Sequence, residues 1–470
     1  MSAAIEIVVE VSAAETEFAG ASEDESAGAV CARATYRDRG PPRAWLGEIV
    51  ENGFRKSVLP NGIRVVSERI PHVRSVAVGV WVDTGSRHEA APVSGVSHFI
   101  EHLVFKGTQS RTAEEIAKAV DSVGGQMDAF TTKEHTCFYV SVLDQHLALA
   151  ADLLSDILQH GLFAIEDIER EKSVVLQEFR MVEDTPDDLI HDLFAERVWP
   201  GHSLGRPILG DKKVVLALDR ETILTYFRDE YCPPRIIVAA AGRLEHEELL
   251  ELLRERFVGF SRTCATRDGD PPTLEPQVQL IDKPLEQVHF VLGGPGLEQD
   301  APERYALYLL NTIVGGSMSS RLFQEVRERR GLVYSIYSGN AAFRDSGLFY
   351  IYAGTESGDF TKVVELVLDE LRKLKRHGVT ADELTRAREH LKGSLMLSLE
   401  STPSRMTRIA KQELYFGRYF TLDEILTAVD RVGAREVEAL IHRLLGGVRL
   451  SLVALGPVAS HAVTPNALVL

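Results

Sequence analysis

Two histidines that stand four residues apart, His98 and His102, constrain how this chain can fold. They occur in the sequence SHFIEHL at residues 97–103, and residues with this spacing share one face of an α-helix. Two imidazoles on one helical face can bind a single metal ion, since zinc–nitrogen bonds of about 2.0–2.1 Å require the rings to converge. Glu101 directly precedes the second histidine, which places its carboxylate beside an open coordination position. The motif therefore predicts a helix that carries part of a metal site.

A catalytic zinc site needs three protein ligands and leaves one position for water, so a further ligand has to come from elsewhere in the chain. Residues 166–182 are predicted to form a helix rich in carboxylates, in which Glu171 and Glu178 are seven residues apart, about two turns. One of them can bind the metal while the other accepts the free N–H of a ligand histidine. The spacing leaves these roles open, and such charge density is also typical of a solvated helix face.

The motif also predicts a reaction, the hydrolysis of a peptide or amide bond. Zinc lowers the pKa of a bound water to about 7 and polarises the scissile carbonyl. Glu101 would then serve as general base and move a proton toward the departing amine, without a covalent intermediate.

The length of the chain predicts more than one hydrophobic core, because 470 residues exceed the roughly 100–200 of a usual domain. Residues 1–52, rich in Ala, Glu and Ser, are expected to form a flexible N-terminal extension. Residues 53–262 read as a first domain that opens with a hairpin at Asn61-Gly62. Its further predicted elements are strands at 75–82 and 236–241 and helices at 112–123, 146–160 and 166–182.

A polar stretch with Gly269, Pro271 and Pro272 predicts a linker at residues 263–276. Residues 277–460 form the predicted second domain, and 461–470 a tail. The second domain is expected to hold strands at 287–292, 334–338 and 348–353 and helices at 305–314, 360–376 and 381–398. The broad order of elements is repeated, so a duplicated unit is a hypothesis from the pattern.

Composition excludes several classes of protein. A net charge of -17 argues against a nucleic-acid partner, and no apolar run approaches the ~20 residues of a membrane span.

Four cysteines lie far apart without a C-x-x-C pair, which favours reduced thiols. No basic residue precedes Arg33, so we expect neither a secretory signal nor a transit peptide, and a cytoplasmic location follows.

The pattern H-x-x-E-H at residues 98–102 is the inverted-zincin signature, and the chain resembles the pitrilysin-like metallopeptidases, in particular bacterial processing proteases and the β subunit of the mitochondrial processing peptidase. The likeness includes VLPNG at 58–62, GSR at 85–87, FKGT at 105–108 and the stretches 199–210 and 315–338, so it covers nearly everything after residue 53. The resemblance implies an α+β fold with two similar α/β-sandwich domains, each a mainly antiparallel sheet covered by helices, joined by a linker.

The resemblance also implies roles for single residues. The family's remaining metal ligand is a glutamate on a later helix, with another glutamate two turns before it, and Glu178 and Glu171 match these places. By that resemblance His98, His102 and Glu178 bind one Zn²⁺ per chain, Glu101 is the catalytic base of an endopeptidase, and Glu171 supports a ligand.

Substrate contacts are implied in two places. Arg327 and Tyr334 resemble the family's C-terminal arginine and tyrosine, which approach the catalytic centre across a cleft, and their donors suit a developing oxyanion. Residues 127–132 resemble the family's edge strand, which pairs with an extended peptide, so Ala129 is predicted to bind substrate. Asp128 stands where asparagine is usual in the family.

The C-terminal half contains no second H-x-x-E-H and resembles the family's inactive domain. Larger relatives join four such domains, whereas this chain has room for two, so the resemblance implies a homodimer that acts on peptides or unfolded presequence-like segments. Two alternatives remain open. One is a non-catalytic scaffold subunit of the same fold, and the other is a metal-dependent hydrolase of small amides. The sequence also leaves open whether the metal is zinc or manganese.

Overall fold

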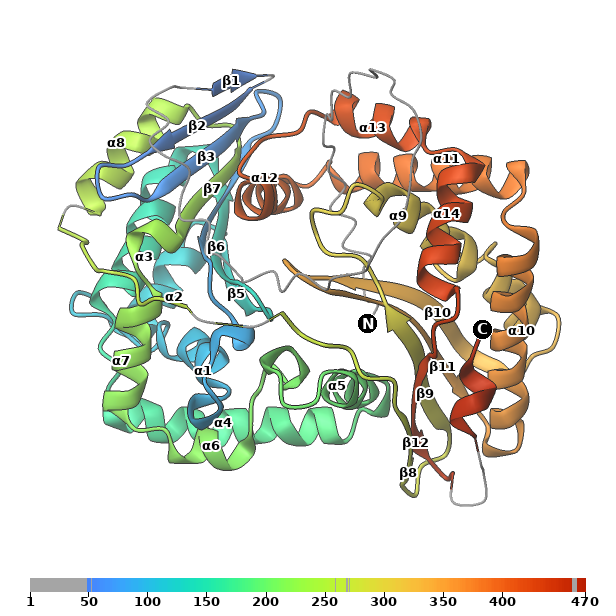
Figure 1. Cartoon of the computed structure of the whole chain (residues 1–470). Helices are drawn as coiled ribbons and strands as arrows, with labels where there is room; N and C mark the ends of the chain where they lie inside the picture. Colours follow the sequence, from blue (N-terminus) through green and yellow to red (C-terminus); the bar gives the residue numbers. More distant parts are fainter. Residues whose placement is uncertain (1–48, 52, 258, 268, 270, 459–462) are drawn as a thin grey trace, which may run out of the picture.

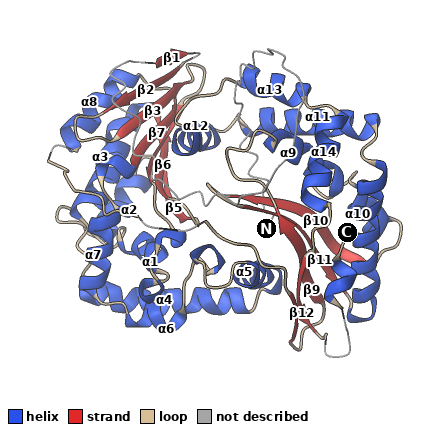
Figure 2. Cartoon of the chain, viewed as in Figure 1, coloured by secondary structure: helices blue, strands red, loops and turns tan. Residues whose placement is uncertain are grey.

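The computed structural model describes residues 49–51, 53–257, 259–267, 269, 271–458 and 463–470 (Figure 1). Within these residues two sheets, each covered by helices, lie side by side (Figure 2). The first has the strand order β1-β2-β3-β7-β4-β6-β5 and the second β10-β11-β9-β12-β8. All pairings are antiparallel except β3 with β7 and β8 with β12. The predicted α+β fold with two similar halves is confirmed.

The first half contains the strands β1 (Ile49–Glu51), β2 (Phe54–Val58), β3 (Arg64–Arg69), β4 (Ser75–Val82), β5 (Gln126–Thr131), β6 (Thr136–Leu143) and β7 (Ile236–Gly242). Its helices are α1 (Val96–Leu103), α2 (Ala113–Asp121), α3 (Leu147–His160), α4 (Ile165–Glu183), α5 (Pro186–Val198), α6 (Lys212–Ala217), α7 (Arg220–Glu230) and α8 (His246–Arg256).

The second half contains the strands β8 (Val278–Asp282), β9 (Val288–Pro295), β10 (Val333–Ala342), β11 (Gly347–Thr355) and β12 (Ser451–Gly456). Its helices are α9 (Arg304–Val314), α10 (Phe360–His377), α11 (Ala381–Ser398), α12 (Thr402–Phe416), α13 (Leu422–Arg431) and α14 (Ala434–Leu445), and a π-helical turn spans Phe323–Glu328.

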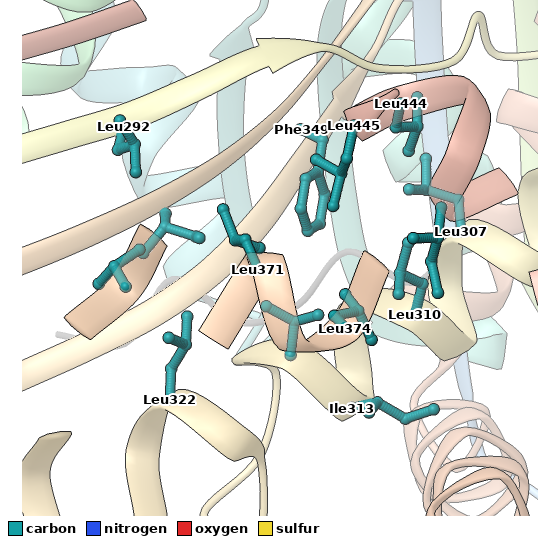
Figure 3. Packing of buried hydrophobic residues seen from close by; sticks show 14 of the residues in the cluster. Leu292, Leu307, Leu310, Ile313, Leu322, Phe349, Leu371, Leu374, Leu444 and Leu445 are labelled. Carbon is teal, nitrogen blue, oxygen red and sulfur yellow. The ribbon is translucent and has the colours of Figure 1, made fainter. Parts of the chain in front are cut away.

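Local sequence accounts for several of these elements. The turn at Asn61-Gly62 joins β2 to β3, and Gly62 has the positive φ of +99° that this turn favours. Strand β4 lies between β6 and β7, so every residue from Val76 to Val82 is buried. In the second half, apolar side chains of α9, α10 and α14 pack against the sheet (Figure 3). Among them are Leu307 and Leu310, Leu371 and Leu374, and Leu444 and Leu445, which lie near Leu292 and Phe349.

The two halves exchange helices. One face of the first sheet packs against α12, whose Met406, Ile409 and Ala410 lie in a buried cluster with Trp81 and Ile237. Helix α5, from the first half, covers one face of the second sheet in the same way. Figure 1 shows both helices between the sheets. Each sheet is therefore buried on its second face by a helix from the other half.

The expectation that the cysteines are reduced is wrong for two of them. Cys232 and Cys264 form a disulfide, with their Cα atoms 5.5 Å apart, whereas Cys137 is a buried free thiol. The physical reason is that the segment after α8 folds back onto the end of α7, where the Ala265 N–H donates to the carbonyl of Asp229 at 3.3 Å. Residues 32 positions apart are thereby brought together. Cys31 lies outside the described residues.

No helix in the described part of the chain is long and apolar enough to cross a bilayer. The cytoplasmic location remains a prediction, and the disulfide argues against it, because such bonds are rare in reducing compartments.

The predicted boundaries also remain predictions. Of the N-terminal extension assigned to residues 1–52, only 49–51 are described, and they form β1. The described residues of the linker, 263–276, contain no helix or strand. In the tail, 461–470, residues 461 and 462 are not described, and Leu468 is buried.

Replacement of Ile409 by alanine tests the helix exchange. The side chain is fully buried between α12 and the first sheet, so we expect the free energy of unfolding to fall by about 3 kcal/mol. Leu397→Ala is the matched control, since that leucine is 76% exposed and its loss should change stability by less than about 0.5 kcal/mol. Chemical denaturation measures both, and equal effects would contradict the packing described.

Candidate metal centre

Helix α1 carries the histidine pair with a fixed orientation. Phe99, Ile100 and Leu103 are fully buried in the hydrophobic core of the first half. The opposite face of the helix therefore presents His98 and His102 toward α4. Figure 1 shows α1 lying beside α4. Burial of the apolar face therefore determines where the imidazoles point.

The start of α1 is held by a residue that the sequence did not reveal. Glu89 accepts the N–H groups of Gly95 and Ser97 at 2.6 and 2.8 Å, which satisfies the first turn of the helix. Burial raises the pKa of Glu89 to about 7, although these hydrogen bonds act in the opposite direction. Gly95 has a φ of +95°, and a Cβ there would lie 2.4 Å from the carbonyl oxygen of Leu209. The helix can therefore begin only at a glycine.

The three predicted ligands are brought together. Glu178 Oε2 lies 3.5 Å from His98 Nε2, and Glu178 Oε1 lies 3.5 Å from His102 Nε2. One ligand atom from each of these residues falls within 4.8 Å of the others. Two ligands of a tetrahedral zinc ion are about 3.4 Å apart, so this spacing fits a zinc site.

The chemistry of these donors also fits a metal. Burial, and then the charge of His102, lower the pKa of His98 to about 4, which keeps its imidazole neutral as a metal ligand requires. Glu178 Oε2 is buried without a hydrogen-bond donor among the described residues. These atoms would hold the ion, and Glu101 would stand beside it.

Glu171 contacts the histidine that it was expected to support. Its Oε2 lies 3.2 Å from His102 Nδ1, and its Oε1 lies 2.8 Å from the Nζ of Lys106. The side chain of Glu171 is only 3% exposed, whereas that of Glu178 is 33% exposed. The carboxylate buried deeper is therefore that of Glu171, which lies beside the Lys106 ammonium and a ring nitrogen of His102.

Glu101 is held by a hydroxyl that sequence reasoning missed. Thr131, the last residue of β5, donates from Oγ1 to Glu101 Oε2 at 2.5 Å. Burial raises the pKa of Glu101, while this hydrogen bond opposes the shift. The period-two pattern of β5 could have given the signal, since Thr131 and Ala129 share the face that packs toward α1.

Ala129 lies on β5, at the open edge of the first sheet and two residues from Thr131. Ala129 is half-buried and packs against the hydrophobic core of the first half. The predicted substrate strand thus runs directly past the carboxylate of Glu101.

Arg327 and Tyr334 lie elsewhere. The Arg327 guanidinium covers the rings of Phe323 at 4.7 Å and Tyr334 at 5.8 Å, and Tyr334 is 79% exposed. Arg327 lies in the π-helical turn before β10, and Tyr334 lies at the start of that strand. Within the described residues no hydrogen bond, ion pair or ring contact joins them to the predicted metal ligands.

The direction of β10 explains this separation. Its far end, at the turn to β11, touches the first half, where the Arg344 N–H donates to Glu134 Oε1 at 3.2 Å. Tyr334 lies at the other end of the strand, roughly 25 Å away. In Figure 1 this strand leads away from the first half. The structure therefore does not bring the pair to the metal centre of the same chain.

Comparison with known proteins agrees with this geometry. Residues 64–212 match the family model "Insulinase (Peptidase family M16)", and residues 217–391 match "Peptidase M16 inactive domain". An uncharacterized zinc protease of Bacillus subtilis is 43% identical over 392 residues, which cover 83% of this chain and 95% of the relative. Another from Streptomyces coelicolor is 42% identical over 86% of this chain and 89% of its own length. The chain belongs to peptidase family M16.

Solved structures share the fold. A protease from Helicobacter pylori superposes with a TM-score of 0.80 at 21% identity, covering 86% of this chain and 99% of that one. A structure described as the peptidase M16 inactive domain from Pseudomonas fluorescens gives 0.81 at 20% identity, covering 87% and 99%. The family resemblance and the two-domain architecture inferred from sequence are thus confirmed.

Replacement of Glu171 by glutamine tests its contact with His102. Loss of the charged acceptor should weaken zinc binding by about tenfold or more, because such partners orient the ligand ring. Glu169→Gln is the matched control on the same helix, since that side chain is 63% exposed and pairs with Lys172. Competition with a chelator measures both affinities, and equal affinities would contradict the role of Glu171.

Proposed function

We propose that this chain is a zinc-dependent endopeptidase that hydrolyses peptides or unfolded presequence-like segments. The observation that carries the proposal is the convergence of His98, His102 and Glu178, with Glu101 beside them. Membership of a family whose relatives are named zinc proteases supports it. One Zn²⁺ per chain is expected, because the described residues provide one such cluster.

When bound by these residues, zinc would supply an acidified water and a Lewis acid for the peptide carbonyl. Glu101 accepts the proton of the attacking water on a carboxylate oxygen and then donates it to the departing amine. The Thr131 hydroxyl keeps that carboxylate in place, and the raised pKa of the Glu101 carboxyl favours its uptake of the proton. Glu171 holds the ring of His102 in one orientation.

The open edge of β5 would bind the substrate as an added strand. Thr132 N–H donates to the His135 carbonyl at 2.8 Å, so these residues form a hydrogen-bonded pair beside the turn. Such pairs alternate along an antiparallel ladder, and the backbone groups of Ala129 and Thr131 therefore point away from β6. A peptide paired with them would pass Glu101.

A second copy of the chain would complete the site. Arg327 and Tyr334 suit an oxyanion by chemistry but lie at the far end of β10, with Tyr334 exposed. In a symmetric homodimer each subunit can present this pair to the metal centre of its partner. This arrangement agrees with the roles that the family resemblance implies for both residues.

Glu101→Gln tests the reaction. The variant should keep its zinc, because Glu101 is not among the ligands, and should lose about 100-fold or more of its turnover, as expected for loss of a general base. Metal analysis and cleavage of an internally quenched peptide, side by side with the wild type, measure both quantities. Metal analysis also distinguishes zinc from manganese.

Equal cleavage by both proteins would contradict the mechanism, and wild-type protein without metal would favour the scaffold subunit instead. That alternative ranks second, since a scaffold would lack a ligand or Glu101, and all are present. Cleavage of blocked amino acids in preference to peptides would favour a hydrolase of small amides.

Mixed dimers test whether Arg327 acts across the subunit boundary. Glu101→Gln and Arg327→Ala copies, co-expressed with different tags and purified as heterodimers, contain one complete site if the arginine comes from the partner. We expect about half of wild-type activity, against little in either parent homodimer. Inactive heterodimers would show that each subunit uses its own arginine, and a monomeric protein would contradict the dimer itself.

A further inference from the structure

The carboxylate of Asp128 lies at the open edge of β5, one residue before Ala129. Its Oδ1 accepts the Ala129 N–H at 2.8 Å. That N–H is one of the groups directed away from β6, so Asp128 occupies the position that the carbonyl oxygen of an added peptide strand would take. A bound peptide would therefore release this carboxylate.

Asp128 belongs to the opposite face of β5 from the catalytic base. Successive side chains of a strand alternate, and Thr131 and Ala129 face α1, so Asp128 shares the other face with Phe130. Phe130 packs with the cluster that contains α12, and Tyr139 lies opposite Asp128 on β6. The carboxylate is exposed there, accepts a hydrogen bond from the Tyr139 hydroxyl, and forms no ion pair among the described residues.

The geometry of strand addition brings one substrate side chain close to it. Asp128 forms its hydrogen-bonded pair with β6, so toward an added strand it forms a non-hydrogen-bonded pair, in which side chains approach most closely. Cβ atoms of such pairs are about 4.5–5.5 Å apart, and opposite charges stabilise them whereas like charges destabilise them. A lysine or arginine on the peptide can reach the carboxylate from there.

We propose that Asp128 selects peptide substrates that carry a lysine or arginine at the position opposite it. This inference rests on the proposed endopeptidase function. In the free protein the carboxylate covers the Ala129 N–H, and on binding it exchanges that partner for the substrate cation. A neutral residue offers the carboxylate no opposite charge, and an acidic residue is repelled.

The test uses a series of internally quenched peptides in which one position at a time carries lysine, glutamine or glutamate. For the wild type we expect kcat/KM at one position to favour lysine over glutamine by up to about fivefold, the range of a cross-strand ion pair. High salt should reduce this ratio, because an exposed ion pair is screened.

Asp128→Asn isolates the charge, since its Oδ1 can still accept the Ala129 N–H. We expect its lysine-to-glutamine ratio to fall to about one, and Asp128→Lys to favour glutamate instead. Glu251→Gln, an exposed residue of α8, removes the same charge elsewhere and should keep the wild-type ratio. Zinc content shows that each variant is folded at the metal centre.

The outcomes are distinguishable. Wild-type protein that cleaves no peptide would overturn the proposed function. Cleavage without a lysine preference at any position, or a preference that Asp128→Asn retains, would overturn the role of Asp128 and leave the peptidase function intact.

Discussion

Burial of one face of α1 is the constraint on which the metal centre depends. Phe99, Ile100 and Leu103 are fully buried, and Gly95 allows the helix to start close to the Leu209 carbonyl. Rotation of the helix would expose these apolar side chains, so the two histidines face α4 and no other direction. The candidate metal ligands are thus positioned by packing of the helix.

The same packing joins the site to the substrate edge. Because α1 lies against β5, Thr131 reaches Glu101, and the strand that contacts this proposed base is also the strand that a peptide would extend. The exchange of α5 and α12 buries the second face of each sheet and fixes the two halves against each other. The candidate metal centre and its edge strand therefore belong to the same packed half of the molecule.

Sequence was sufficient where the signal was local. Spacing of four and seven residues marked the pairs His98 and His102 and Glu171 and Glu178, although only the family resemblance distinguished the roles of the two glutamates. Hydrophobic periodicity placed β4 as the structure has it. Contacts between segments that are distant in the chain could not be predicted from the sequence. Glu89 caps a helix from outside it, and Cys264 meets Cys232 only because a coil folds back. The positions of the exchanged helices α5 and α12 are likewise set by tertiary contacts, since an amphipathic pattern predicts a buried face but not the sheet that it packs against.

Zinc-edge X-ray absorption spectroscopy of the metal-loaded protein tests the central claim most directly, because it reports the atoms bound to the ion. The account predicts two imidazole nitrogens at about 2.0–2.1 Å, with the remaining donors oxygen and none sulfur. This shell should be lost in Glu178→Gln, which removes the ligand that joins α4 to α1. A shell with sulfur, or with fewer than two imidazoles, would contradict the metal centre proposed for this chain.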